Sequence, residues 1–242
     1  MLKILELFGG IGSPRVALRN LGIPVKSIDY VEIDEKAVRS YNAIFRGDLS
    51  HKTQDVRGWN LKPDILIHGS PCQDFSIAGR QRGADPNSGT RSSLMWETIS
   101  IVRNMGLWKP RIIIWENVKN VRTHYMVHNY ELYIAELQQM GYISSCALLD
   151  ARDFGLPQAR ERVFTVSILG GKEFDFTHLK RKPISWLSWK AALLMIITEL
   201  KLHQCLGQSG RQELSGDFLL SMITVGRLQN DRTERRDADA CQ

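Results

Sequence analysis

The sequence lacks the features of membrane proteins, disulfide-stabilised proteins and zinc proteins. No stretch approaches the ~20 consecutive apolar residues that a membrane helix needs, and the first residues leave no room for a signal peptide. The four cysteines, Cys72, Cys146, Cys205 and Cys241, form no C-x-x-C pair, which argues against a disulfide framework or a metal site. We therefore expect a cytoplasmic protein with reduced thiols and no metal.

The composition fits a globular protein. The chain has 242 residues, of which 43% are hydrophobic and 24% charged, enough to bury a core. The formal net charge of +6 is compatible with a polyanionic partner but does not require one.

Short apolar runs alternate with stretches of helical periodicity over the first two thirds of the chain. Uniformly apolar runs are typical of strands covered on both faces, so we predict an α/β fold with a doubly wound, mostly parallel sheet. Ser13-Pro14 is expected to cap the first helix, and Asp34 the second. The predicted strands are residues 4–8, 25–33, 64–68, 111–116, 145–149 and 163–169. The predicted helices begin at Ser13 and Asp34 and span 94–105 and 130–140.

The end of the chain has a different character. We predict a helix over 191–206, a polar loop over 208–216 and a frayed end over 227–242, where charges of both signs follow no period. The expected division is a catalytic and cofactor-binding domain over 1–180 and an atypical tail over 181–242.

A glycine-rich turn, residues 8–12, follows the first predicted strand and precedes a helix, the context of a nucleotide-type cofactor loop. Gly10 and Gly12 would let backbone N–H groups approach a ligand. Glu32 ends the second strand, where an acid can accept from ribose hydroxyls. Arg15 replaces the third glycine of the dinucleotide fingerprint, so the pattern suggests an adenosine ligand without requiring a pyrophosphate. The alternative is a tight strand–helix connection.

Cys72 follows the third predicted strand, and Pro71 fixes the backbone before it. Ligands bind at the carboxyl ends of strands in open α/β sheets, and a thiolate is a strong nucleophile. An isolated cysteine is more often a small buried side chain, but this strand-end position favours a nucleophile.

A carboxyl group and two arginines follow further along the chain. Glu116 ends the next predicted strand, where it would share the crevice with Cys72, and partial burial would favour its protonated form. Arg160 and Arg162 are two residues apart, so on a strand both point to one face and could grip a phosphate or a base carbonyl. The alternatives are a helix cap for Glu116 and a solvated charged edge for the arginines.

Taken in order, these segments resemble the cytosine-5 DNA methyltransferase family over residues 2 to about 168. Its specific segments are Pro71-Cys72-Gln73, Glu116-Asn117-Val118 and Gln158-x-Arg160-x-Arg162. The other matching positions are Phe8 to Gly12, Glu32, Asp55-Val56, Phe75-Ser76, Arg91, Leu94, Glu97 and Asp153 to Pro157.

The resemblance implies a Rossmann-like fold, S-adenosylmethionine as cofactor and methyl transfer to C5 of a cytosine through a covalent Cys72 adduct at C6. Glu116 would then protonate N3, and Arg160 would hold O2, with Arg162 beside it. Glu32 would take the ribose hydroxyls, and Asp55 the adenine amino group. The cofactor pocket would comprise Phe8, Gly10, Gly12, Glu32, Ile33, Asp55, Val56, Pro71 and Leu94.

The implied partner is double-stranded DNA, from which the target base must be flipped out. Residues 76–89 resemble the family's mobile loop, and the implied DNA contacts are Ser76, Arg80, Arg82 and Gln158. The family's variable DNA-reading domain and closing Asn-Glu segment find no match after Lys180. The chain is then the catalytic part of a split enzyme, a truncated non-catalytic binding module or a degenerate relative, and a tRNA cytosine-5 methyltransferase is a further alternative.

Overall fold

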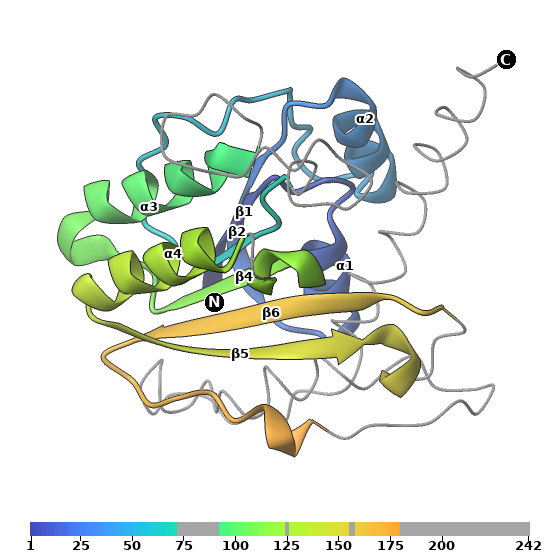
Figure 1. Ribbon diagram of the computed structural model, residues 1–242. Coiled ribbons are helices and arrows are strands. Elements are labelled where there is room, and N and C mark those ends of the chain that lie inside the picture. Colours follow the sequence, from blue (N-terminus) through green and yellow to red (C-terminus); the bar gives the residue numbers. More distant parts are fainter. Residues whose placement is uncertain (72–91, 124–125, 155–157, 180–242) are drawn as a thin grey trace, which may run out of the picture.

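The computed structural model describes residues 1–71, 92–123, 126–154 and 158–179, and Figure 1 shows the chain as a ribbon. The strands are β1 (Leu2–Leu7), β2 (Val25–Val31), β3 (Ile65–His68), β4 (Ile112–Val118), β5 (Tyr142–Asp150) and β6 (Glu161–Leu169). The α-helices are α1 (Ser13–Asn20), α2 (Glu35–Ile44), α3 (Met95–Asn104) and α4 (Val127–Gln139). Short 3₁₀ turns span Ser92–Leu94, Gly106–Trp108, Lys119–Arg122, Ala151–Phe154 and Phe176–His178.

The strands form one sheet of order β2-β1-β3-β4-β6-β5. The pairs β1/β2, β1/β3 and β3/β4 are parallel, whereas β6 runs antiparallel to both β4 and β5. The predicted mostly parallel α/β sheet is therefore confirmed. The antiparallel β6 matters for the site, because its beginning lies beside the end of β4, where Val118 pairs with Arg162.

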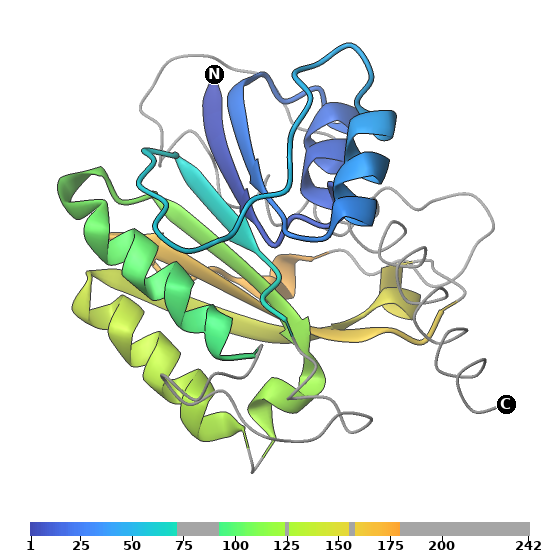
Figure 2. The ribbon, with the colours of Figure 1, turned by 90° about the horizontal axis from the view of Figure 1, so that it is seen from above.

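Helices cover both faces of the sheet, as Figure 2 shows. On one face, Ala17 and Leu18 of α1 pack against Ile4 and Ile67. On the other face, residues of α3 and α4 such as Ile99 and Leu137 belong to the core that includes alternate strand residues. Because neighbouring strand residues point to opposite faces, these strands are apolar at nearly every position.

The first helix is capped differently from the prediction. The N-cap of α1 is Gly12, in the left-handed conformation and without a side-chain hydrogen bond, whereas Ser13 is already the first helical residue. The expected Ser13 cap is therefore wrong, because the helix begins one residue earlier than the Ser-Pro signal indicated and Gly12 takes the cap position. The Asp34 cap of α2 is confirmed, since its Oδ1 accepts from the Lys36 N–H at 2.9 Å.

The glycine turn packs closely against α2. Gly12 has φ +85°, and a Cβ there would lie 2.5 Å from the Tyr41 ring and 2.7 Å from Phe45. The backbone N–H of Gly12 donates to the Gly9 carbonyl at 2.9 Å. Gly12 is thus needed for the turn and for its packing against aromatic rings, and its own N–H is used within the turn.

Several boundaries differ from the prediction. β4 continues to Val118, so Glu116 lies within the strand and not at its end. The predicted elements at 191–206, 208–216 and 227–242, and the whole predicted tail 181–242, lie outside the described residues. Within the described part of the chain, no helix is long and apolar enough to span a membrane.

Substitution of Gly12 by alanine should destabilise the protein by about 2–5 kcal/mol, because it adds left-handed backbone strain and a steric clash. Gly22 is the matched control, because it has φ +64° but open space around a Cβ; Gly22→Ala should cost only about 1–2 kcal/mol. Urea denaturation measures both. Equal losses would contradict the role assigned to the Tyr41 and Phe45 contacts.

Candidate functional site

A cavity of about 150 Å³ lies where the carboxyl ends of β1 and β3 meet β4 and the residues before β6. It is lined by the glycine turn, by Gly69 after β3, by Glu116 of β4 and by Arg160. The full lining is Glu6, Leu7, Phe8, Gly9, Gly10, Ile11, Ser13, Pro14, Ile67, His68, Gly69, Glu116, Arg160 and Phe164. Four predicted site residues, Phe8, Gly10, Glu116 and Arg160, thus share one cavity.

The Glu116 carboxylate lies between two guanidinium groups. Its Oε1 is 3.0 Å from Arg162 Nε and 3.9 Å from an Arg160 terminal nitrogen. The side chains of Arg160 and Arg162 are only 12% and 18% exposed, and that of Glu116 is 24% exposed. The arginines therefore do not form a solvated edge, and Glu116 does not cap a helix. Glu116, Arg160 and Arg162 instead form one partly buried ion-pair cluster beside the cavity.

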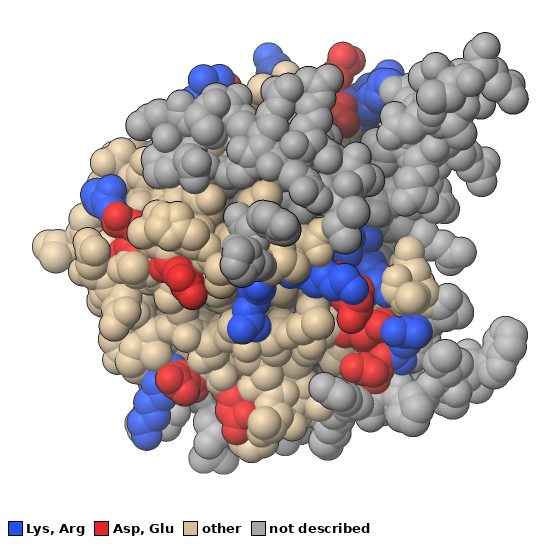
Figure 3. Space-filling model, viewed as in Figure 1, with Lys and Arg blue, Asp and Glu red and all other residues tan. Residues whose placement is uncertain are grey.

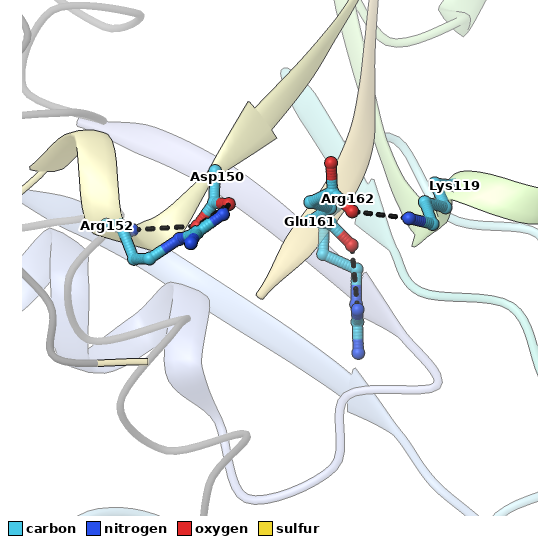
Figure 4. Close-up of polar contacts among 5 residues, drawn as sticks. All are labelled: Lys119, Asp150, Arg152, Glu161 and Arg162. Atoms are coloured by element: carbon cyan, nitrogen blue, oxygen red, sulfur yellow. Dashed lines mark hydrogen bonds and ion pairs between the residues drawn. The ribbon is translucent and has the colours of Figure 1, made fainter. Parts of the chain in front are cut away.

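Two further ion pairs lie at the end of β5 and the beginning of β6, where Figure 4 shows them. Lys119 Nζ is 2.5 Å from a Glu161 carboxylate oxygen, and an Arg152 terminal nitrogen is 2.6 Å from Asp150 Oδ2. Arg162 also donates to the Glu161 carbonyl at 2.8 Å. Acidic and basic side chains accordingly lie side by side on the face seen in Figure 3.

The segment that leads to Cys72 runs directly beside Glu116. A Cβ on Gly69 would lie 3.5 Å from Glu116 Oε2, and Ser70 is buried next to Asn117. Pro71 is the last described residue before the gap. The predicted residues Cys72, Ser76, Arg80 and Arg82 lie outside the described residues.

Glu32 holds the glycine turn from the end of β2. Its Oε2 accepts from the Gly10 N–H at 2.9 Å, and its Oε1 accepts from the N–H groups of Ile33 at 2.8 Å and Asp34 at 2.9 Å. The Gly10 N–H is therefore also not free for a ligand. A carboxylate can accept about four hydrogen bonds, so one acceptor position of Oε2 remains.

The remaining predicted cofactor residues surround the glycine turn less directly. The loop before Asp55 is tied to Glu32, because the Gln54 N–H donates to the Glu32 carbonyl at 2.7 Å. Arg57 donates to both Asp55 oxygens, which lowers the Asp55 pKa to about 2 and keeps this carboxylate ionised. Phe8, Val56 and Leu94 belong to one hydrophobic cluster. Ile33 is exposed, and Gln158 is half-buried.

Two buried titratable residues that line the cavity, Glu6 and His68, were not predicted. Glu6 is fully buried, with the Arg15 backbone and the Tyr41 side chain beside its carboxyl group. Burial raises its pKa to about 8, and the charge of Arg15 opposes this shift only in part. His68 donates or accepts through Nε2 at 2.9 Å from the Tyr133 hydroxyl, and burial lowers its pKa to about 3. The sequence did carry a signal for Glu6, because it is the single acidic residue within the buried strand Leu2–Leu7.

A larger cavity of about 550 Å³ lies at α1, β2 and the loop after α2, and it includes Arg15, Arg19 and His51. It contains none of the predicted site residues, so the smaller cavity is the better candidate for chemistry. Among the described residues, no cluster of three or more metal-binding side chains occurs.

Comparison with known proteins identifies the class. The model of the C-5 cytosine-specific DNA methylase family matches residues 2–220, and the chain belongs to this family. Type II methyltransferase M2.ScrFI of Lactococcus lactis subsp. cremoris is 30% identical over 240 residues, covering 76% of this chain and 66% of that protein. M.NlaX of Neisseria lactamica is 37% identical over 179 residues, covering 73% of this chain and 55% of that protein.

The chain spans between one third and two thirds of the length of the curated relatives that it matches. Among solved structures, it resembles a putative DNA modification methyltransferase from an Escherichia coli prophage, with a TM-score of 0.61, 21% identity and coverage of 78% of this chain and 53% of that one. Schizosaccharomyces pombe Dnmt2 gives a TM-score of 0.55, 22% identity and coverage of 71% and 50%. These likenesses confirm the Rossmann-like fold.

Substitution of Glu6 by glutamine should flatten the pH dependence of stability. An unfolded glutamate ionises near pH 4.5 and the folded one near pH 8, so between these values the folded state holds an extra proton and rising pH favours unfolding. From pH 6.5 to 8 the unsubstituted protein should lose about 1–2 kcal/mol relative to Glu6→Gln. Denaturant unfolding at several pH values measures this.

The range from pH 6.5 to 8 excludes an effect of His68. The pKa of this histidine is about 3 in the folded protein and ordinarily 6.5, so its titration changes stability only below about pH 6.5. Glu131→Gln, on the exposed side of α4, is the control and should leave the slope unchanged. A slope that is the same in Glu6→Gln and the unsubstituted protein would show that Glu6 is ionised in the folded state.

Proposed function

We propose that the chain is the catalytic part of a DNA cytosine-5 methyltransferase that forms a covalent bond between Cys72 and C6 of a flipped cytosine. The observation that carries the proposal is the shared cavity. It is lined by the glycine turn, Gly69, Glu116 and Arg160. Family membership supports the reaction class.

The residues around the glycine turn fit S-adenosylmethionine. Glu32 keeps one acceptor position for a ribose hydroxyl, and the ionised Asp55 can accept from the adenine amino group. Gly10 and Gly12 shape the turn, and apolar surface comes from Phe8, Ile33, Val56, Pro71 and Leu94. When bound, S-adenosylmethionine supplies an electrophilic methyl group on a sulfonium sulfur.

The reaction requires a nucleophilic C5, which free cytosine does not offer. Attack of the Cys72 thiolate on C6 forms an S–C bond and moves the electrons of the C5–C6 double bond toward C4 and N3, which gives C5 enamine character. A proton moves to N3 at the same time. After C5 is methylated, loss of the C5 proton restores the double bond and expels the Cys72 thiolate.

In this proposal, Glu116 transfers the proton to and from N3. It donates a proton to N3 as negative charge develops and takes it back when Cys72 leaves. Arg162, 3.0 Å from Oε1, orients the carboxyl group, and Arg160, which lines the cavity, contacts O2 of the base. Donors fixed in advance at a site of developing charge are often the largest catalytic contribution.

DNA provides the target base, which must leave the duplex at a cost of a few kcal/mol. Ser76, Arg80, Arg82 and Gln158 are proposed to contact DNA, and phosphate contacts make binding depend steeply on salt. A second subunit that supplies target recognition is part of the proposal.

The decisive test is transfer of labelled methyl groups from S-adenosylmethionine to unmethylated genomic DNA, followed by bisulfite sequencing. The chain is tested alone and with the product of its neighbouring open reading frame. We expect 5-methylcytosine at a defined sequence, and Cys72→Ser should lower the rate at least 1000-fold because it removes the nucleophile.

Cys146→Ser is the matched control, because Cys146 lies on β5; it should retain the rate within twofold. Binding of S-adenosylmethionine and DNA without methyl transfer would favour the non-catalytic module. Faster methylation of tRNA than of DNA would contradict DNA as the substrate.

Removal of the Arg162 side chain tests the role of the ion pair. Arg162→Ala should lower kcat/KM about 100-fold, since Glu116 loses the group that orients it. Arg103→Ala removes an ion pair between α3 and α4 instead and should stay within twofold. If both variants have the same activity, the Arg162–Glu116 contact is not part of the catalytic machinery.

A further inference from the structure

Two side chains of β4 hold the residue that lies two positions before Cys72. Trp115 donates its indole N–H to Ser70 Oγ at 3.1 Å, and Asn117 Nδ2 donates to Ser70 Oγ at 3.3 Å and to the Ser70 carbonyl at 3.4 Å. All three residues are at least 95% buried. An unpaired polar group in such a place is costly, so these contacts fix Ser70 strongly.

The contacts are arranged around Glu116. Trp115 and Asn117 flank it on β4, so their side chains point to one face of the sheet while Glu116 points to the other. There the Glu116 carboxylate meets Arg162. The same three residues of β4 therefore hold the segment that leads to Cys72 and carry the proposed proton donor.

Packing fixes the direction of the Trp115 N–H. The Trp115 ring stacks on His68 at 5.7 Å between centroids and 4° between planes, and it lies 4.5 Å from the Tyr133 ring. His68 is in turn hydrogen-bonded to the Tyr133 hydroxyl. With its ring enclosed in this way, Trp115 cannot turn its N–H away from Ser70 without repacking the core.

We propose that Ser70 is a positioning residue for the methyl-transfer reaction. Its Oγ, held by Trp115 and Asn117, fixes the backbone that leads to Pro71 at a set position beside Glu116. This inference rests on the proposed function, because positioning has meaning only if Cys72 reacts. Ser70 itself does not touch the base, and misplacement of a reacting group by about 1 Å can cost about 100-fold in rate.

The variants Ser70→Ala, Trp115→Phe and their combination test the contact, with Ser100→Ala on α3 as control, since its hydroxyl bonds only within its own helix. We expect both single variants to lower kcat at least tenfold, with the S-adenosylmethionine Kd and the KM for DNA within twofold. The double variant should be no worse than the poorer single one, because the two residues act through one hydrogen bond.

Hydrogen exchange measured by mass spectrometry gives a readout that does not need activity. The peptide covering residues 69–73 should exchange at least tenfold faster in Ser70→Ala than in the unsubstituted chain, while a β1 peptide is unchanged. Unchanged exchange of residues 69–73 would overturn the inference, whether or not the protein is active.

The kinetic outcomes separate the remaining possibilities. Faster exchange with an unchanged kcat would overturn the positioning role. If the variants that lose kcat also bind S-adenosylmethionine more weakly and melt at a lower temperature, Ser70 has a general structural role, and this result would also overturn the inference. No methyl transfer by the unsubstituted protein in any assay would instead defeat the proposed function, and hydrogen exchange would still decide whether Ser70 anchors its segment.

Discussion

The contact between Glu116 and Arg162 joins two strands that run in opposite directions, and the candidate site depends on it. β4 pairs in parallel with β3 and antiparallel with β6. This pairing brings the end of β3, the last residues of β4 and the beginning of β6 to one edge of the sheet. A carboxylate, two largely buried guanidinium groups and the segment before Cys72 are thereby brought together.

The cavity beside this contact has walls of different character. The turn that Glu32 holds makes a wall of satisfied backbone groups, whereas His68 contributes buried ring atoms, among them Nδ1 without a partner among the described residues. Such atoms reduce stability unless something pairs with them. Unpaired polar atoms in a cavity can form hydrogen bonds with a polar ligand. Proteins often have lower local stability at functional sites for this reason.

The sequence predicted the local elements well, because apolar runs and capping residues act over a few positions. Asp34 caps α2 as expected, and the spacing of Arg160 and Arg162 agrees with their common approach to Glu116. The placement of β6 between β4 and β5 depends on contacts far apart in the chain, which periodicity does not carry. The same limit applies to the packing of Gly12 on Tyr41 and to the bond between Trp115 and Ser70.

The central claim is that Cys72 and Glu116 act on one flipped base. Its most direct measurement uses DNA that contains 5-fluorocytosine, because the fluorine at C5 cannot leave as a proton does and the covalent adduct persists. With S-adenosylmethionine present, mass spectrometry should find the base attached to the peptide that contains Cys72, and Glu116→Gln should form this adduct much more slowly. Methyl transfer with no adduct, or an adduct at Cys146, would contradict the account.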